Sequence, residues 1–240
     1  MADILDNAAH LAQTIGARPA GTEEERQAAL YLSEAFQRKA GLPTEVEDFT
    51  CPTDFELPRA ILCILAVVLT ALTFFIPVLV VVAFIVTLLL AALYAVETLV
   101  RPVLARALSH GASQNVVAKF EPAPKGDARA ARQRKVVLVA HYDTGKVRAE
   151  LQPALQWATV GGMVVLALML LVRMVSMPTG PFAVVVTVLS ALACVACLLP
   201  VVSFALHRSA PYNEGANCNA AGVAVLLEVA QRVRKGHARA

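Results

Sequence analysis

Three long stretches without a charged side chain constrain this chain more than any other feature. Residues 60–96 contain no charge in 37 positions, residues 151–172 none in 22, and residues 174–206 none in 33. A helix needs roughly 20 apolar residues to cross the hydrocarbon core of a bilayer. The chain is 58% hydrophobic and 16% charged, against about 45–50% and about 25% in a typical soluble domain. These values exclude an ordinary soluble globule and a disordered chain.

Proline and turn residues divide these stretches into two helical hairpins. Pro77 interrupts the stretch 60–96, where a helix has to break or kink. In the region 151–206, the sequence Met-Pro-Thr-Gly-Pro at 177–181 predicts a turn. Four spans are therefore predicted, at 59–76, 78–98, 154–173 and 182–206. The alternative is two pairs of very apolar core helices. Membrane helices are favoured because each stretch exceeds the threshold of roughly 18 residues.

The basic residues predict which side of the membrane the polar pieces occupy. Of 21 Lys and Arg residues, 20 lie on the same predicted side of the membrane, and only Arg173 falls at a far-side turn. By the positive-inside rule, the polar pieces and both termini are expected to be cytoplasmic. No signal peptide is expected, because the first apolar stretch begins about 58 residues into the chain. The net charge of +3 is modest, so we expect contact with membrane lipid and no nucleic-acid partner.

The polar pieces show the pattern of one α/β domain. Helices are predicted at 3–14, 22–40 and 219–234, and strands at 44–49, 115–120 and 136–140. Thr22 and Glu25 form a capping box at the start of the second helix. The continuous apolar run 136–140 is typical of a strand buried on both faces of a mixed or parallel sheet. The expected order is therefore soluble domain 1–58, hairpin 59–98, central strands 99–153, hairpin 154–206, and loop with helix 207–240.

Two short segments carry candidate metal ligands. His141 and Asp143 follow the run 136–140 directly, and sites in α/β sheets gather at the carboxyl ends of strands. A histidine there can bind metal through one ring nitrogen while a carboxylate fixes the ring. Cys218 precedes the last helix, and a thiolate is a good zinc ligand. The alternatives are an ordinary polar histidine and a small buried cysteine that fills a turn.

The other cysteines do not indicate a disulfide framework or a second metal site. Cys63, Cys194 and Cys197 lie inside predicted spans. Cys194 and Cys197 have the spacing of a redox or zinc motif, but they sit in an uninterrupted apolar helix without a second pair. They are predicted to be packing residues.

Four segments, taken together and in order, resemble the family-28 metallopeptidases, which are di-zinc aminopeptidases and their relatives. The segments are 18–22 (Arg-Pro-Ala-Gly-Thr), 115–118 (Asn-Val-Val-Ala), 137–144 ending in His-Tyr-Asp-Thr, and 215–228. The resemblance implies an α/β fold: a partial mixed-sheet domain of the zinc-aminopeptidase type, flanked by helices and here interrupted by the two transmembrane hairpins. It also implies cleavage of N-terminal residues from peptides.

The resemblance assigns roles to three residues. His141 is implied to be a zinc ligand, and Asp143 to be the catalytic-site carboxylate beside it. Position 218 corresponds to the aspartate that bridges the two metals in the family, but here it is Cys218. A thiolate offers one sulfur at about 2.3 Å, whereas a carboxylate offers two oxygens at about 2 Å. We therefore expect one zinc ion or none in place of two.

A second departure concerns the rest of the family's site. The Glu-Glu pair that supplies the general base, and the later Asp and His, have no counterpart after Cys218, and Glu228 lies within its helix. We expect this chain to be an incomplete or inactive membrane-bound zinc aminopeptidase. The remainder of the site would lie on a complementing C-terminal chain, or be lost by truncation or a frameshift. The alternatives are a degenerate membrane-anchored binding or assembly module and, third, a small transporter, although the spans lack the charges that mark a transport pathway.

Overall fold

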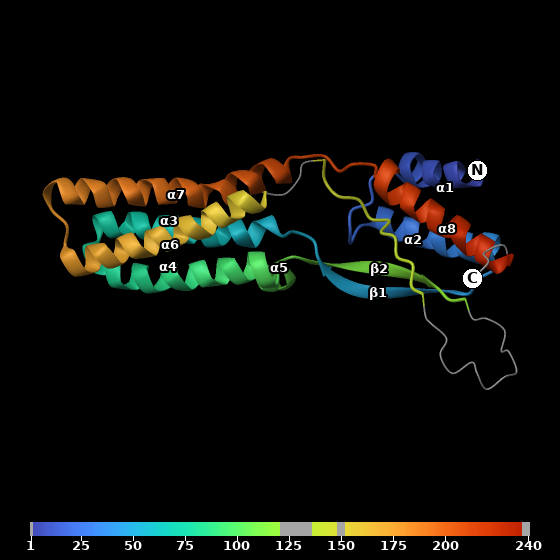
Figure 1. The fold of residues 1–240 in the computed structure, drawn as a ribbon, viewed down its shortest axis with the longest axis horizontal. Coiled ribbons are helices and arrows are strands. Elements are labelled where there is room, and N and C mark those ends of the chain that lie inside the picture. The colour runs from blue at the N-terminus through green and yellow to red at the C-terminus, as the bar shows by residue number, and fades with distance from the viewer. Residues whose placement is uncertain (1, 121–135, 148–151, 237–240) are drawn as a thin grey trace, which may run out of the picture. The chain divides into compact units, whose positions relative to one another are not determined.

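The computed structural model describes residues 2–120, 136–147 and 152–236. It divides into two compact units (Figure 1). The polar unit comprises Met1–Cys51, Gly111–Val147 and Tyr212–Ala240, and the bundle unit comprises Pro52–His110 and Arg148–Pro211.

The bundle unit contains four long apolar helices arranged in a closed ring. They are α3 (Glu56–Phe75), α4 (Val80–Ala95, continued at either end by η3, Pro77–Leu79, and η4, Val96–Val100), α6 (Pro153–Ser176) and α7 (Gly180–Arg208). Helix α3 contacts α4, α4 contacts α6, α6 contacts α7, and α7 contacts α3. Each is long and apolar enough to cross a membrane, with mean hydropathy between 2.2 and 2.9. The expectation of four such helices is confirmed, with breaks at the two predicted turns.

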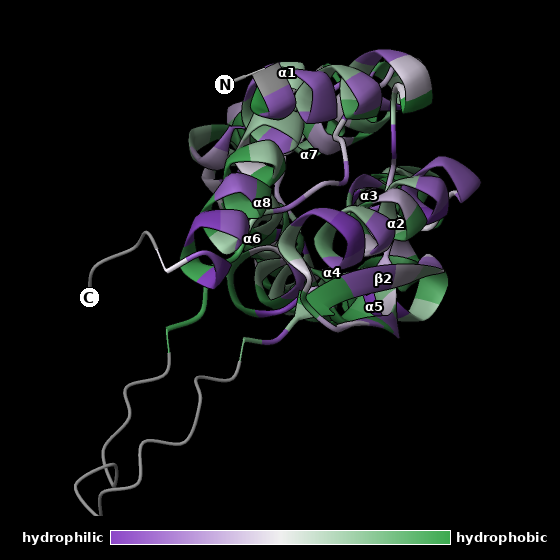
Figure 2. Ribbon diagram, turned by 90° about the vertical axis from the view of Figure 1, so that its right-hand side faces the viewer, coloured by the Kyte–Doolittle hydropathy of each residue, from purple (hydrophilic) through white to green (hydrophobic). Residues whose placement is uncertain are grey.

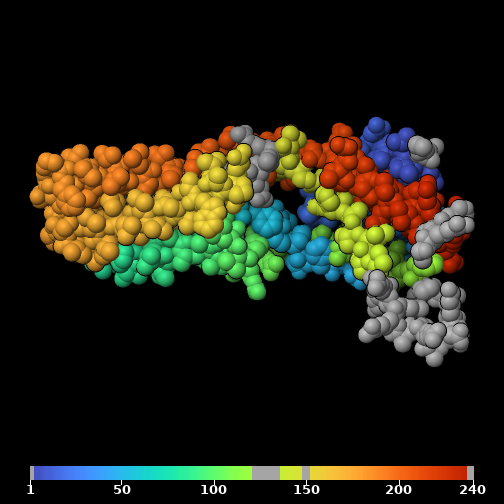
Figure 3. Space-filling view, in the orientation of Figure 1, coloured from blue at the N-terminus to red at the C-terminus, as the bar shows by residue number. Residues whose placement is uncertain are grey.

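The bundle interior combines small and medium-sized side chains with the fully buried ring of Tyr94. Ala66, Met163 and Leu166 are fully buried there, as are the thiols of Cys63 and Cys197. Both cysteines are free, in agreement with the prediction that they are packing residues. Helices α6 and α7 lie against each other along much of their length (Figure 3).

Polar groups fix the ends of the bundle helices. Asp54 accepts the backbone N–H groups of Glu56 and Leu57 at 2.9 and 3.0 Å, which caps the start of α3. The buried Glu97 carboxylate accepts the N–H groups of Leu104 and Ala105 at 2.7 and 2.9 Å, in the first turn of α5 (Val103–Leu108). These contacts satisfy donors that a helix start leaves without intrahelical partners.

Arg173 ties α6 to the end of α3. Its guanidinium donates to Thr73 Oγ1 at 2.6 Å and to the Thr73 carbonyl at 3.1 Å. The guanidinium carbon also lies 4.1 Å from the ring centroid of Phe74, which is a cation–π arrangement. The cation within the apolar sequence therefore has local partners on a neighbouring helix.

The polar unit packs three helical segments around two small cores. They are α1 (Ala2–Ala9) with η1 (His10–Ile15), α2 (Glu23–Ala35) with η2 (Phe36–Ala40), and η6 (Ala216–Ala220) with α8 (Ala221–Arg234). One core includes Leu11, Leu32 and Val223, and the other includes Phe36 and Leu227. Hydrophobic and hydrophilic residues alternate around α2 and α8, as expected for helices with one buried face (Figure 2).

The start of α2 follows the predicted capping pattern with a small change. Thr22 Oγ1 accepts the Glu25 N–H at 3.4 Å, and the Glu25 carboxylate returns to the Gly21 N–H at 2.6 Å, one residue earlier than a standard capping box. The buried Glu25 also accepts a hydrogen bond from Ser113 Oγ at 2.5 Å. The cap therefore also connects α2 to the sheet.

The sheet is smaller than the sequence suggests. Strands β1 (Thr44–Pro52) and β2 (His110–Ala118) form an antiparallel pair, so the strand expected at 115–120 begins earlier. The prediction of a buried strand at 136–140 is wrong: this segment has no regular secondary structure, and Val136 and Val139 are 81% and 86% exposed. A strand that is buried on both faces needs neighbouring strands on either side. The sheet contains β1 and β2, which pair with each other and not with 136–140. Of the central strands expected within 99–153, the described residues 99–120, 136–147 and 152–153 contain β2 alone.

Candidate functional site

The segment 141–147 presents alternate side chains to the core and to solvent. Tyr142 and Thr144 are buried, whereas His141 is exposed and Asp143 is half-exposed. The Tyr142 hydroxyl donates to the Gln114 carbonyl of β2 at 2.5 Å, and its ring lies in the core with Leu11. Burial raises the pKa of Tyr142, which keeps this hydroxyl protonated as a donor. The inward residues therefore fix where His141 and Asp143 stand.

A glycine lets the loop before α8 approach this segment closely. Gly215 has φ = 62°, and a Cβ at this position would lie 2.6 Å from Thr144 Cγ2. Only glycine tolerates both the left-handed backbone and this contact. Further along, the Asn213 N–H donates to the Gly145 carbonyl at 3.0 Å, and Lys146 pairs with Tyr212 in an isolated antiparallel bridge. The two candidate segments are thus joined at several points.

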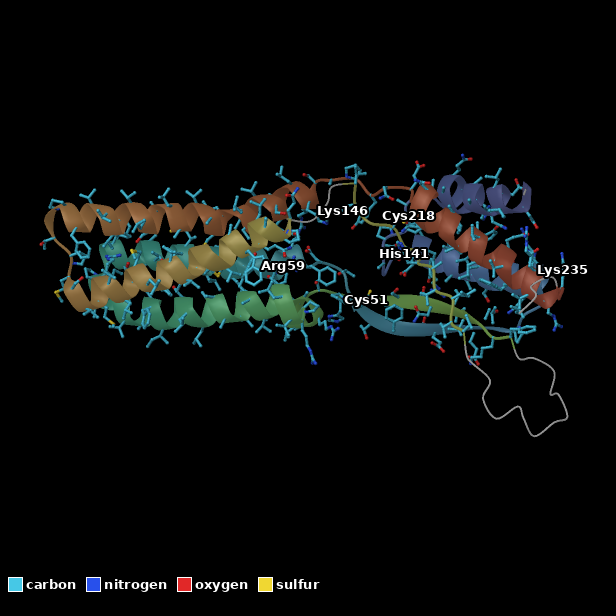
Figure 4. All side chains as sticks on the ribbon, in the orientation of Figure 1. Cys51, Arg59, His141, Lys146, Cys218 and Lys235 are labelled. Atoms are coloured by element: carbon cyan, nitrogen blue, oxygen red, sulfur yellow. The ribbon has the colours of Figure 1, made fainter. Side chains whose placement is uncertain are left out.

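This approach brings His141 and Cys218 together, 77 residues apart in sequence (Figure 4). Cys218 Sγ lies 4.0 Å from His141 Nε2. The other ring nitrogen, Nδ1, lies 3.4 Å from Asp143 Oδ1 and 3.1 Å from the Asn219 amide nitrogen. The Asn219 amide also donates to the Asp143 carbonyl. Imidazole, thiol, carboxylate and amide therefore form one cluster, and the side chains of His141 and Cys218 are open to solvent.

The geometry of the cluster is close to that of two ligands on one zinc ion. Tetrahedral ligation at about 2.1 Å to nitrogen and about 2.3 Å to sulfur places the two ligand atoms about 3.6 Å apart, against 4.0 Å here. With Asp143 beside Nδ1, the Nε2 of His141 is the nitrogen that faces Cys218. A carboxylate on the second ring nitrogen is the usual partner of a metal-binding histidine.

The cluster does not fit the bridged metal pair of the resembled family. Within residues 2–120, 136–147 and 152–236, no three His, Cys, Asp or Glu side chains are placed to hold one metal ion together. Two hollows of about 370 and about 320 Å³ occur elsewhere, and neither is lined by His141 or Cys218. The residues present fit two positions of a single zinc site.

Asn219 and Arg18 support this cluster, although the sequence did not mark either of them as a site residue. Asn219 is buried and contacts both His141 and Asp143, and Arg18 is buried directly beneath the segment. Burial lowers the pKa of Arg18, and the nearby Asp143 carboxylate opposes that effect. Arg18 belongs to the 18–22 motif, so its position was visible in the sequence but its contacts were not.

Cys51 and Glu228 lie outside the cluster. Burial raises the pKa of the half-buried Cys51 thiol, and the Glu25 carboxylate raises it further. Glu228 accepts a hydrogen bond from Arg232 at 2.8 Å, one turn further along α8. Glu228 is therefore an intrahelical partner of Arg232.

Comparison of the chain with protein-family models, with curated proteins and with solved structures finds no match in any of the three. The resemblance to the family-28 metallopeptidases accordingly stays a prediction from the four sequence segments.

Proposed function

We propose that this protein is a membrane-bound zinc-aminopeptidase-like protein in which His141 and Cys218 bind a single zinc ion. One observation carries the proposal: the ring nitrogen Nε2 of His141 faces the exposed thiol of Cys218, while Asp143 stands beside Nδ1. The four segments that resemble the metallopeptidases support the same assignment. On that resemblance, the substrate class is peptides with a free N-terminus.

Two protein ligands leave this site incomplete for hydrolysis. Zinc takes four ligands in most protein sites, and His141 and Cys218 supply two. When bound, zinc would supply Lewis-acid chemistry and lower the pKa of a coordinated water. Peptide cleavage also needs a general base, which the resembled family takes from its later Glu-Glu pair. We propose that further ligands and this base come from a complementing chain.

Metal analysis of the purified full chain in detergent tests the proposal. In equilibrium dialysis against buffered zinc, we expect binding to saturate at about one zinc ion per chain, and to be lost in both His141→Ala and Cys218→Ser, because each removes one of two protein ligands. Cys51→Ser, which removes a thiol away from the cluster, is the control and should keep its zinc. Two zinc ions per chain, or equal zinc in all variants, would contradict a single His–Cys site.

A catalytically degenerate binding or assembly module is the second candidate. It is favoured by the lack of a third ligand among the described residues. An aminopeptidase assay on the zinc-loaded chain separates the two candidates. A module stays inactive with any added partner, whereas the incomplete enzyme gains activity when the missing ligands are supplied. The transporter is less favoured, because Arg173, the cation within the apolar sequence, is held by Thr73 and Phe74.

The four apolar helices could cross a membrane, and we propose that the polar unit lies on the cytoplasmic side. Cys218 is the better reporter because it is exposed. The Cys51 thiol is half-buried and burial raises its pKa, so we expect it to react more slowly. In intact cells, with a membrane-permeant zinc chelator present so that Cys218 is free of metal, a membrane-impermeant maleimide should label Cys218 only after permeabilisation. Labelling of Cys218 in sealed cells would overturn this orientation.

A further inference from the structure

Arg18 is a charged residue that is completely buried in the polar unit. Its side chain is 0% exposed. Its Nε donates to the Tyr142 carbonyl at 2.9 Å, and its Nη1 donates to the carbonyls of Leu11 and Gly16. Burying a charge is costly unless it is hydrogen-bonded. Here Nε and Nη1 donate to carbonyls of the nearby residues Leu11 and Gly16 and of the distant Tyr142, while Nη2 has no hydrogen-bond partner among the described residues.

The backbone of Arg18 also hydrogen-bonds to this segment, at Thr144, the residue after Asp143. The Arg18 N–H donates to Thr144 Oγ1 at 2.7 Å, and the Thr144 N–H donates back to the Arg18 carbonyl at 2.8 Å. Arg18 therefore holds Tyr142 and Thr144, the two residues that flank Asp143. His141, next to Tyr142, is placed by the same contacts.

We infer that Arg18 is the positioning residue of the metal site: its contacts to Tyr142 and Thr144 set the geometry of His141 and Asp143 relative to Cys218. The inference rests on the proposed function, because it concerns the same pair of ligands. Thr144 also restrains the loop that carries Cys218, because its Cγ2 packs against Gly215 in that loop. One buried side chain and one buried hydroxyl thus align ligands from two segments.

The alternative is that Arg18 only stabilises the turn after η1, through Leu11 and Gly16. The two roles differ in the segment 141–145: stabilising the turn needs only the contacts to Leu11 and Gly16, whereas positioning also needs those to Tyr142 and Thr144. Thr144→Val keeps the shape of the side chain but removes the hydroxyl that Arg18 contacts, whereas Thr144→Ser keeps the hydroxyl. This pair tests the restraint without leaving a buried charge unpaired.

The experiment measures zinc affinity and amide hydrogen exchange in the full chain for wild type, Arg18→Met, Thr144→Val and Thr144→Ser. Arg26→Met, which changes an exposed arginine of α2, is the control. Residues that orient a metal ligand typically change metal affinity by about 10–100-fold. We expect a weakening in that range for Arg18→Met and about tenfold for Thr144→Val. Thr144→Ser and Arg26→Met should bind as wild type does.

Hydrogen exchange provides a readout that does not depend on zinc. In the metal-free chain, the amides of 141–145 should exchange faster in Arg18→Met and Thr144→Val, while those of α8 stay protected. If Arg18→Met unfolds the whole polar unit, Arg18→Lys decides on the side chain, because it keeps a buried charge but lacks the Nε–H that donates to the Tyr142 carbonyl. Thr144→Val then decides on the contact to the Arg18 backbone. Folded variants with wild-type zinc affinity would overturn the role of Arg18. A wild-type chain that binds no zinc would overturn the proposed function, while the exchange result would still report on the restraint.

Discussion

Zinc will slow the alkylation of Cys218 by iodoacetamide, and replacing His141 with alanine will abolish this protection. A thiolate bound to zinc is a weaker nucleophile than a free thiolate, so the rate mainly follows the fraction of chains without metal. At a free zinc concentration of about ten times Kd, the expected slowing is about tenfold. The measurement is the labelling rate of each cysteine by peptide mass spectrometry, with and without zinc.

Cys51 serves as the internal control in the same experiment. Its thiol is half-buried and its pKa is raised by burial and by Glu25. Because the thiolate is the reactive form, Cys51 should react slowly at neutral pH and faster as the pH rises, with no effect of zinc at any pH. Alkylation of Cys218 at the same rate with and without zinc would show that Cys218 is not a ligand.

Replacing Gly162 with leucine will destabilise the helical bundle, whereas the same change at Gly161 will not. A Cβ at Gly162 would lie 2.8 Å from Ala196 Cβ and 3.2 Å from the Ala193 carbonyl oxygen of α7. A Cβ at Gly161 meets nothing within 4 Å. Overpacking of a well-filled interface costs about 1–3 kcal/mol, and the larger leucine side chain places this variant at about 3 kcal/mol.

The neighbouring glycine isolates the steric effect. Both substitutions replace glycine by a better helix former, which favours the helix by up to about 1 kcal/mol in each variant. The difference between the two variants therefore reports the contact between α6 and α7. Thermal unfolding in detergent, followed by circular dichroism, measures it. Equal unfolding temperatures for the two variants would show that α6 and α7 do not pack at Gly162.

The apolar helices were predictable because their signal is local. Hydrocarbon thickness sets the length of a span, and Pro77 and the turn that follows Ser176 end helices by their own backbone chemistry. Helix α3 runs Glu56–Phe75 where 59–76 was predicted, and α6 runs Pro153–Ser176 where 154–173 was predicted. The differences lie at helix ends, where capping by residues such as Asp54 adds turns that hydropathy does not register.

The sheet was less predictable because burial of a strand depends on distant partners. The run 136–140 has the composition of a central strand, yet Val136 and Val139 are exposed and the two described strands pair with each other. Residue composition alone cannot supply the neighbours that a buried strand needs.

The sequence marked His141, Asp143 and Cys218, which the structure brings into one cluster, but it did not mark Arg18 and Asn219, which support that cluster. His141 and Cys218 stood out because their residue types bind metal and their segments resemble a known family. Arg18 and Asn219 act through contacts to backbone carbonyls and to a ring nitrogen. Such contacts follow no sequence spacing, so they emerge only when the chain is folded.

The absorption spectrum of the cobalt(II)-loaded chain tests the proposed His–Cys metal site most directly. Cobalt(II) takes the same tetrahedral ligands as zinc and, unlike zinc, absorbs light. The proposal predicts a sulfur-to-cobalt charge-transfer band that saturates at one cobalt ion per chain, and that is missing in Cys218→Ser and weakened in His141→Ala. A spectrum without the charge-transfer band, or a band that persists in Cys218→Ser, would contradict it.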